Sequence, residues 1–256
     1  MRICHISDTH GEFPILNNKF DVIVHSGDFF PNSPAILFGS SGQEAEFQKD
    51  WLTKRIPDLK DMVGNYPFLF TLGNHDFLSS EIVEQLLQQA GIKAFSLNNK
   101  HVTIDSINLY GFPYIPYISG KWNYELMLPE MQIQVDKMTE QLNSVQTHVL
   151  VCHAPIYKTL DLAFSNNNFG STVIANMLDY SISQNKMPVA YLHGHIHEAA
   201  GISIRNNLLV SNAATTQQII CLPDIPKDRA QRLKDLGFED LTPDQLANIQ
   251  LGRNLI

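Results

Sequence analysis

The chain has 256 residues, of which 44% are hydrophobic, and its 18 basic and 26 acidic side chains give a formal net charge of −8. This composition is typical of a soluble globular protein, and the acidic excess argues against a general nucleic-acid-binding surface. No apolar run approaches ~18 residues, so no membrane helix is expected. The N-terminus lacks the apolar core of a signal peptide, and three unpaired cysteines in apolar stretches (Cys4, Cys152 and Cys221) are expected to be reduced core residues. We therefore expect a cytoplasmic protein that does not bind membranes.

One unit recurs along the chain: a short apolar run followed abruptly by polar residues. The five pairs are "RICHIS" and "DTHG", "DVIVHS" and "GDFF", "PFLFTL" and "GNHD", "HVLVC" and "HAP", and "VAYLH" and "GHIH". Apolar residues at both odd and even positions predict strands that are buried on both faces. Helical patterns are predicted between these runs over residues 44–62, 79–91, 128–142 and 171–182, the first of them interrupted at Pro57. Alternating strands and helices predict an α/β sandwich, in which ligands bind beyond the carboxyl ends of the strands.

The character of the sequence changes after Leu222. Residues 1–222 carry every strand–polar unit and are predicted to form one domain, whereas residues 223–256 are predicted to form a short helical appendage. Thr242, Pro243 and Gln245 have the spacing of a capped helix start in that appendage. Covering a sheet edge is the simplest role for it, and a dimer contact or a lid are the alternatives.

The polar clusters supply the residue types of a transition-metal site. Carboxylates, an amide and several imidazoles suit first-row transition metals, whereas calcium and magnesium prefer oxygen ligands. Two ions ~3.5–4 Å apart that share a carboxylate would use the whole set. The candidate residues are Asp8, His10, Asp28, Asn74, His75, Asp76, His153, His195 and His197.

The ordered series D-x-H, G-D, G-N-H-D, H and G-H-x-H resembles the calcineurin-like metallophosphoesterase superfamily over roughly residues 1–222. This resemblance implies a four-layer αββα sandwich with two divalent ions (Mn, Fe, Zn, Co or Ni) at the sheet ends, where a bridging hydroxide attacks phosphorus in line. It assigns one ion to Asp8, His10, Asp28 and His197, and the other to Asp28, Asn74, His153 and His195. His75 resembles the histidine that assists the leaving group, and Asp76 is expected either to orient His75 or to be exposed to solvent.

Two departures narrow the expected substrate. The second block reads "GDFFPN" and lacks the arginine of the protein Ser/Thr phosphatases, so a protein phosphatase is disfavoured. The segment 110–126 is rich in aromatic residues and proline, and is similar to the metallophosphoesterase-domain proteins of the brain-protein-239 type and their bacterial relatives, which act on phosphodiesters including cyclic nucleotides. Tyr114, Tyr117 and Trp122 either line a wall against which a base stacks or simply pack this loop.

We therefore expect a phosphodiesterase for small-molecule phosphoesters, with cyclic nucleotides among the candidates. A phosphomonoesterase or nucleotidase is the alternative, followed by a nuclease and by a metal-binding module without catalysis. His5, His25 and His193 lie inside the predicted strands and are expected to be core residues or supports for the ligands, while His101 and His148 are expected on the surface. The sequence does not indicate an oligomeric state.

Overall fold

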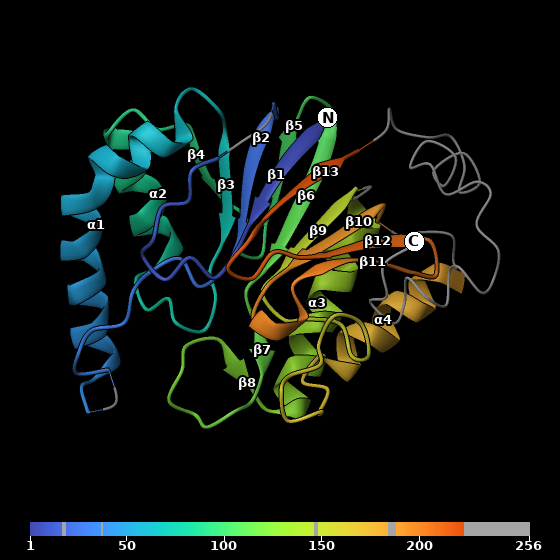
Figure 1. Ribbon diagram of the computed structural model, residues 1–256. Helices are drawn as coiled ribbons and strands as arrows, with labels where there is room; N and C mark the ends of the chain where they lie inside the picture. Colours follow the sequence, from blue (N-terminus) through green and yellow to red (C-terminus); the bar gives the residue numbers. More distant parts are fainter. Residues whose placement is uncertain (17–18, 37, 146–147, 184–187, 223–256) are drawn as a thin grey trace.

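The computed structural model describes residues 1–16, 19–36, 38–145, 148–183 and 188–222, and the predicted helical appendage lies outside them. Two β-sheets lie face to face between two pairs of helices, as Figure 1 shows. The predicted four-layer αββα sandwich is confirmed. No helix of the described part is long and apolar enough to cross a membrane.

The strands within each sheet are mostly parallel. The five-stranded sheet has the order β13-β1-β2-β3-β4, with only β13 antiparallel, and consists of β1 (Arg2–Ile6), β2 (Val22–Ser26), β3 (Phe68–Thr71), β4 (Ala94–Ser96) and β13 (Gln217–Cys221). The six-stranded sheet has the order β11-β12-β10-β9-β6-β5, and the strands at both of its edges are antiparallel to their neighbours. Its strands are β5 (His101–Ile104), β6 (Ile107–Phe112), β9 (Val149–Cys152), β10 (Ala190–His193), β11 (Gly201–Arg205) and β12 (Leu208–Asn212). Two short strands, β7 (Ile115–Pro116) and β8 (Glu125–Leu126), pair outside these sheets. The carboxyl ends of the parallel strands meet at one edge of each sheet.

Each central strand contributes side chains to two cores. Val22 and Val24 of β2 pack in the core between the sheets, whereas Ile23 faces the helices that cover the five-stranded sheet. Val149 of β9 likewise faces the other sheet, and Leu150 faces the opposite pair of helices. Because neighbouring side chains of a strand point to opposite faces, a strand covered on both sides needs apolar residues at every position. The prediction of two-faced burial is confirmed.

The four predicted helices are present within a few residues of their expected bounds. α1 (Ser41–Val63) and α2 (Ser80–Gln89) cover the five-stranded sheet, and α3 (Leu128–Ser144) and α4 (Thr172–Ser183) cover the six-stranded sheet (Figure 1). Ser40 begins α1 with a capping box, in which its hydroxyl accepts from the Gln43 backbone N–H. The predicted interruption at Pro57 is wrong, because α1 continues through it. Pro57 is exposed, so the carbonyl that it leaves without a helical partner can meet water.

Two further expectations about burial are wrong. Cys221 is exposed at the end of the edge strand β13, although Cys4 and Cys152 are buried as predicted. His148, which was expected on the surface, is 5% exposed, and its Nδ1 accepts a hydrogen bond of 3.0 Å from the Asn108 backbone. His148 directly precedes the central strand β9 and therefore shares its burial, whereas His101 on the edge strand β5 is half-buried.

Candidate metal centre

The residues predicted to bind metal lie together where the two sheets meet. Asp8, Asp28 and Asn74 follow β1, β2 and β3 of the five-stranded sheet, with His10 two residues beyond Asp8. The six-stranded sheet provides the remaining three histidines, which follow β9 and β10: His153, His195 and His197. Each sheet therefore contributes about half of the site, because the parallel strands end at the same edge.

The first group of ligand atoms belongs to Asp8, His10 and His197, and one ligand atom from each lies within 4.8 Å of the others. His197 Nε2 is 3.2 Å from Asp8 Oδ1. Ligands of one divalent ion sit about 2.0–2.2 Å from it, which separates them from each other by about 3 Å. The spacing and the nitrogen and oxygen donors of this group fit a transition-metal ion.

The second group consists of Asp28, His153 and His195, whose ligand atoms lie within the same 4.8 Å limit. His153 Nε2 is 3.3 Å from Asp28 Oδ2 and 3.0 Å from Asn74 Oδ1, so the amide adds a fourth donor. Asp28 Oδ2 is also 3.9 Å from His10 Nε2 of the first group. The Asp28 carboxylate thus lies between the two groups, where a shared ligand has to be.

Two glycines allow the loops to approach this closely. A Cβ atom on Gly194 would lie 2.0 Å from Asp8 Oδ2, and one on Gly73 would lie 2.4 Å from Asp28 Oδ1. Asp8 and Asp28 themselves have φ angles of 52° and 56°, in the left-handed region that non-glycine residues rarely adopt. Such backbone strain is concentrated at functional sites, where the surrounding structure enforces it. The glycine in "GHIH" therefore makes room for the Asp8 carboxylate.

The charges of the centre match the needs of metal ligands. Burial raises the pKa of the Asp8 carboxyl, but the His197 hydrogen bond and the His153 charge lower it below its usual range. Burial lowers the pKa of His195 to about 3, which keeps its imidazole neutral and able to bind metal. Burial also opposes protonation of His153, but the Asp28 carboxylate outweighs burial and raises the pKa of His153 to about 9. A metal ion binding there would displace that proton.

His75 lies at the edge of the centre without belonging to either ligand group. Its Nε2 is 4.0 Å from Asp28 Oδ2, and its Nδ1 is 2.9 Å from Asn32 Oδ1. The neighbouring Asp76 is fully buried, so of its two predicted alternatives solvent exposure is wrong. Its carboxylate accepts backbone hydrogen bonds from Phe30 at 2.9 Å and Gly73 at 2.8 Å, and burial together with the Asp28 charge raises its pKa to about 7. Asp76 thus ties together the loops that follow β2 and β3, and a part in catalysis stays a prediction.

The three aromatic residues predicted to bind substrate have different surroundings. The Trp122 ring lies against the His75 ring, with centroids 4.1 Å apart and an interplanar angle of 36°. Tyr114 packs edge-on against Phe112, and Tyr117 is half exposed. Trp122 is therefore the member of this set that contacts a residue of the centre, and substrate contact by any of the three stays a prediction.

Several supporting residues escaped the sequence analysis. The Ser26 carbonyl accepts from His153 Nδ1 at 2.9 Å, which turns Nε2 toward the centre. Gln48 of α1 is fully buried, and its side chain donates to the His75 carbonyl at 2.7 Å. Asn32 contacts the His75 ring, as described above. A backbone carbonyl leaves no signal in a sequence, but a glutamine one turn before the buried Leu52 is a signal that could have been used.

The three strand histidines are buried, as predicted. His5, His25 and His193 are all 0% exposed. His5 bonds across the sheets, to Ser211 of β12 at 2.8 Å and to Ser26 of β2 at 2.9 Å. Burial lowers the pKa of His25 to about 3 and that of His193 to about 4, and places the pKa of His5 well below its ordinary value.

Acid is expected to destabilise the metal-free protein through these histidines. Their pKa values are lower in the folded state than in the unfolded state, so the unfolded state binds more protons below about pH 6.5, and stability falls as the pH falls through that value. Each histidine should cost about 2 kcal/mol of unfolding free energy by pH 5. Urea unfolding of chelator-treated protein at pH 7 and pH 5 measures the loss. His5→Gln should reduce it, and an identical pH dependence in the two proteins would contradict this origin.

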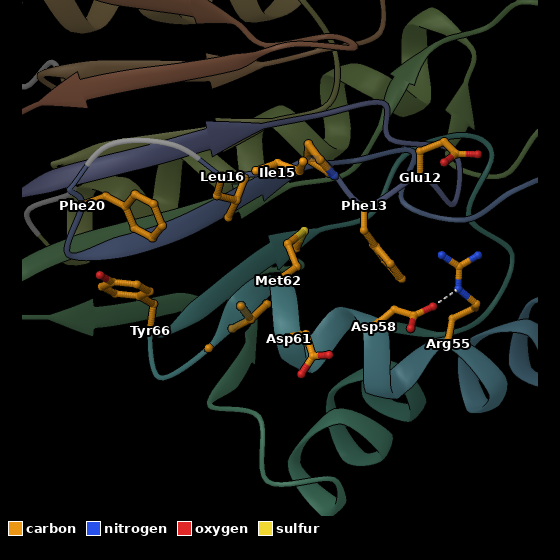
Figure 2. Close-up of a pocket in the computed structure, with 13 residues that line it drawn as sticks. Glu12, Phe13, Ile15, Leu16, Phe20, Arg55, Asp58, Asp61, Met62 and Tyr66 are labelled. Atoms are coloured by element: carbon orange, nitrogen blue, oxygen red, sulfur yellow. Dashed lines mark hydrogen bonds and ion pairs between the residues drawn. The ribbon is translucent and has the colours of Figure 1, made fainter.

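A separate cavity of about 680 Å³ lies between the segment after β1 and α1 (Figure 2). Phe13, Leu16 and Met62 line it, and Arg55 pairs with Asp58 beside it at 2.6 Å. None of the metal-centre residues lines this cavity. Its volume therefore does not belong to the candidate centre.

Comparison with known proteins agrees with the geometry. The model of the calcineurin-like phosphoesterase family matches residues 1–199. The chain is 24% identical over 223 residues to UPF0046 protein K07C11.7 of Caenorhabditis elegans, a match that covers 84% of this chain and 69% of the worm protein. A solved structure of TT1561 from Thermus thermophilus is similar with a TM-score of 0.52 at 12% identity, covering 86% of this chain and 97% of that chain. Another solved structure has a TM-score of 0.61 at 14% identity, with 82% and 89% of the two chains covered.

These structural similarities concern the fold alone, because the identities are low. The family match, in contrast, spans most of the chain and includes every residue of the two ligand groups. It also includes the parallel strands β1, β2, β3, β9 and β10 that position those residues. The chain belongs to the calcineurin-like phosphoesterase family.

Proposed function

We propose that this protein is a phosphodiesterase that acts on small phosphodiesters, with cyclic nucleotides among the candidate substrates, and that it uses two divalent transition-metal ions (Mn, Fe, Co, Ni or Zn). The observation that carries the proposal is the position of Asp28. Its Oδ2 is 3.3 Å from His153 Nε2 in one ligand group and 3.9 Å from His10 Nε2 in the other. One carboxylate between two groups of nitrogen and oxygen donors is the arrangement that a pair of ions requires.

When bound, the two ions would polarise the phosphoryl oxygens and lower the pKa of bound water. The chain holds the site in place through strained, buried loops, so that little rearrangement is needed during the reaction. His75 can deliver a proton to the leaving oxygen from Nε2, because that atom faces the centre at 4.0 Å from Asp28 Oδ2.

Charge favours a diester over a monoester. Two divalent ions would carry +4, the carboxylates of Asp8 and Asp28 carry −2 and a hydroxide nucleophile would carry −1, which would leave a net charge of about +1. In the described part of the chain, the arginines and lysines that form ion pairs do so with carboxylates outside the two ligand groups. A diester monoanion needs less compensating charge than a monoester dianion, so a centre whose ligand carboxylates form no ion pair with a described arginine or lysine suits the diester.

The test compares substrates after metal exchange. Protein stripped with a chelator should be inactive, and adding back Mn, Fe, Co, Ni or Zn should restore turnover of bis(p-nitrophenyl) phosphate and of cyclic nucleotides. The same preparation should turn over p-nitrophenyl phosphate more slowly. Faster monoester hydrolysis would instead identify a phosphomonoesterase, and preferred cleavage of an oligonucleotide would identify a nuclease. Metal binding without turnover of any of these would identify a non-catalytic module.

Replacing Trp122 tests the predicted wall for a base. Trp122→Ala should raise KM for nucleotide diesters about tenfold or more, since stacking on one base contributes about 1–3 kcal/mol. Metal content should stay unchanged, and Trp122→Phe should restore most of the binding. Steady-state kinetics on a nucleotide diester and on a diester without a base measure the effect. Because the Trp122 ring lies 4.1 Å from the His75 ring, an equal loss on both substrates would mean that it acts by packing on His75.

A further inference from the structure

Two of the groups that contact the His75 ring, Asn32 and Trp122, belong to neither ligand group, and the third, His10, is a candidate ligand. Asn32 Oδ1 is 2.9 Å from His75 Nδ1, on the side of the ring away from the centre. Trp122 lies on the ring at 4.1 Å, and His10 meets it edge-on at 4.9 Å. The remaining polar atom, Nε2, faces the Asp28 carboxylate at 4.0 Å. One ring nitrogen is thus occupied by the protein, and the other is left to the reaction centre.

The segment that carries Asn32 is fixed on both sides of that residue. The Phe30 N–H donates to Asp76 Oδ1 at 2.9 Å, and Asp76 is the neighbour of His75. The Ser33 N–H donates to Glu44 Oε1 at 2.7 Å. An exposed asparagine is usually free to change rotamer, but here its backbone is tied both to the His75 loop and to a helix.

The same helix also holds the His75 loop. Gln48 of α1 donates to the His75 carbonyl at 2.7 Å and accepts from the Phe77 N–H at 2.7 Å and the Leu78 N–H at 3.0 Å. Glu44 and Gln48 are four residues apart, so they lie on one face of α1, and both are buried, at 3% and 0% exposure. One turn of α1 therefore anchors both the Asn32 segment and the His75 loop. Helix α1 therefore sets the distance between the Asn32 amide and the His75 imidazole.

We propose that Asn32 is a positioning residue for His75, an assignment that rests on the proposed role of His75 in assisting the leaving group. The Asn32 carbonyl oxygen accepts a hydrogen bond from Nδ1–H, and this bond selects the tautomer and fixes the direction of the ring. Neutral His75 then carries its proton on Nδ1, and the proton given to the leaving oxygen is the second one, which the imidazolium form carries on Nε2 and which leaves the neutral Nδ1–H ring behind. An amide does this without adding a negative charge next to the centre.

The tautomer can be measured directly. Long-range ¹H–¹⁵N spectra of histidine-labelled protein distinguish the Nδ1–H tautomer from the Nε2–H tautomer. They would be recorded on the metal-free protein and on protein loaded with diamagnetic Zn. The signals that disappear in His75→Ala identify those of His75. We expect the Nδ1–H form in the wild-type protein and in Asn32→Asp, and a gain of the Nε2–H form in Asn32→Ala. Metal content should be equal in all variants. An Nε2–H tautomer in the wild type, or an unchanged tautomer in Asn32→Ala, would overturn the proposal.

Kinetics provide a second readout. Asn32→Ala should lower kcat for a nucleotide diester about tenfold or more. This loss is a part of the roughly 10²–10⁴-fold that a general acid contributes to the rate. The loss of kcat on a p-nitrophenyl diester should be smaller, because its leaving group needs less help. Asn32→Asp should recover most of that loss. Asn176→Ala, an exposed asparagine on α4, should have no effect. In the His75→Ala background, Asn32→Ala should cost nothing more, because positioning residues act only through their partner.

The experiments distinguish a failure of the proposed catalytic role of His75 from a failure of the proposed positioning role of Asn32. If His75→Ala leaves nucleotide turnover unchanged, the proposed role of His75 is wrong, and the spectra still decide whether Asn32 holds the ring. If His75→Ala is impaired and the two substitutions lower kcat independently, Asn32 does not act through His75 and the positioning role is wrong.

Discussion

Asp28→Ala is expected to lose both metal ions. Asp28 Oδ2 lies 3.3 Å from His153 Nε2 and 3.9 Å from His10 Nε2, and no other carboxylate of the two ligand groups lies between them. The backbone N–H of His75, which donates to Asp28 Oδ1 at 2.8 Å, also loses its acceptor in this variant. Activity should fall by more than the roughly 10²–10³-fold that the loss of one preorganised electrostatic contact costs. Elemental analysis of the purified variant measures the metal content.

His10→Ala is the matched control for this change. His10 belongs to the first ligand group alone and is partly exposed, so its removal should weaken one ion and leave the other bound. Asp28→Asn offers a second comparison, because it keeps the shape of the side chain and the acceptor for the His75 N–H while removing the charge. Two metal ions retained per chain in Asp28→Ala would mean that the carboxylate is not shared.

The second large effect is expected from His75→Ala, and it depends on the leaving group. p-Nitrophenolate departs readily without a proton, whereas a ribose alkoxide does not, so a general acid matters far more for a nucleotide diester. We expect a loss of about 10²–10⁴-fold on nucleotide diesters and a modest loss on p-nitrophenyl esters. Metal content should be preserved, because His75 belongs to neither ligand group. Single-turnover rates on both substrates, measured at equal metal loading, separate chemistry from product release.

His75→Gln is the useful companion to that variant. It keeps a polar group of similar reach but cannot exchange a proton near neutral pH. If Gln restores activity on both substrates, His75 stabilises charge on the phosphoryl group rather than donating a proton. If the alanine variant loses metal, His75 supports the ligands instead.

The strand pattern of the sequence was sufficient to predict the layers and the meeting point of the candidate ligands for one physical reason. Apolar residues at every position of a short run identify a strand covered on both faces, and parallel strands end at a common edge. Asp8, Asp28 and His153 follow such runs within two residues, so their meeting point could be inferred without any knowledge of distances. The GHIH segment was harder to interpret, and its glycine is explained only by the closeness of the Asp8 carboxylate.

The rest of the site depends on contacts between segments far apart in the chain. Asn32 meets His75 across 43 residues, and Gln48 meets the His75 carbonyl across 27. Neither pairing follows from a local period, because it is set by how α1 packs against the five-stranded sheet. His148 and Cys221 were misplaced for a related reason, since burial at a strand end depends on whether the strand is central or at an edge.

The two sheets supply ligands to the same centre, and this has a consequence for how the molecule holds together. Asp8 and His197 are 189 residues apart, and Asp28 and His153 come from opposite sheets. An ion bound by either pair fastens one half of the sandwich to the other, in the way that a cross-link closes a long loop and removes entropy from the unfolded chain. With both ions in place, the two halves should open as a single cooperative unit. Without them, the interface between the sheets is held by side-chain packing and by hydrogen bonds such as those of His5 and that of His153 to the Ser26 carbonyl, and it should open more easily.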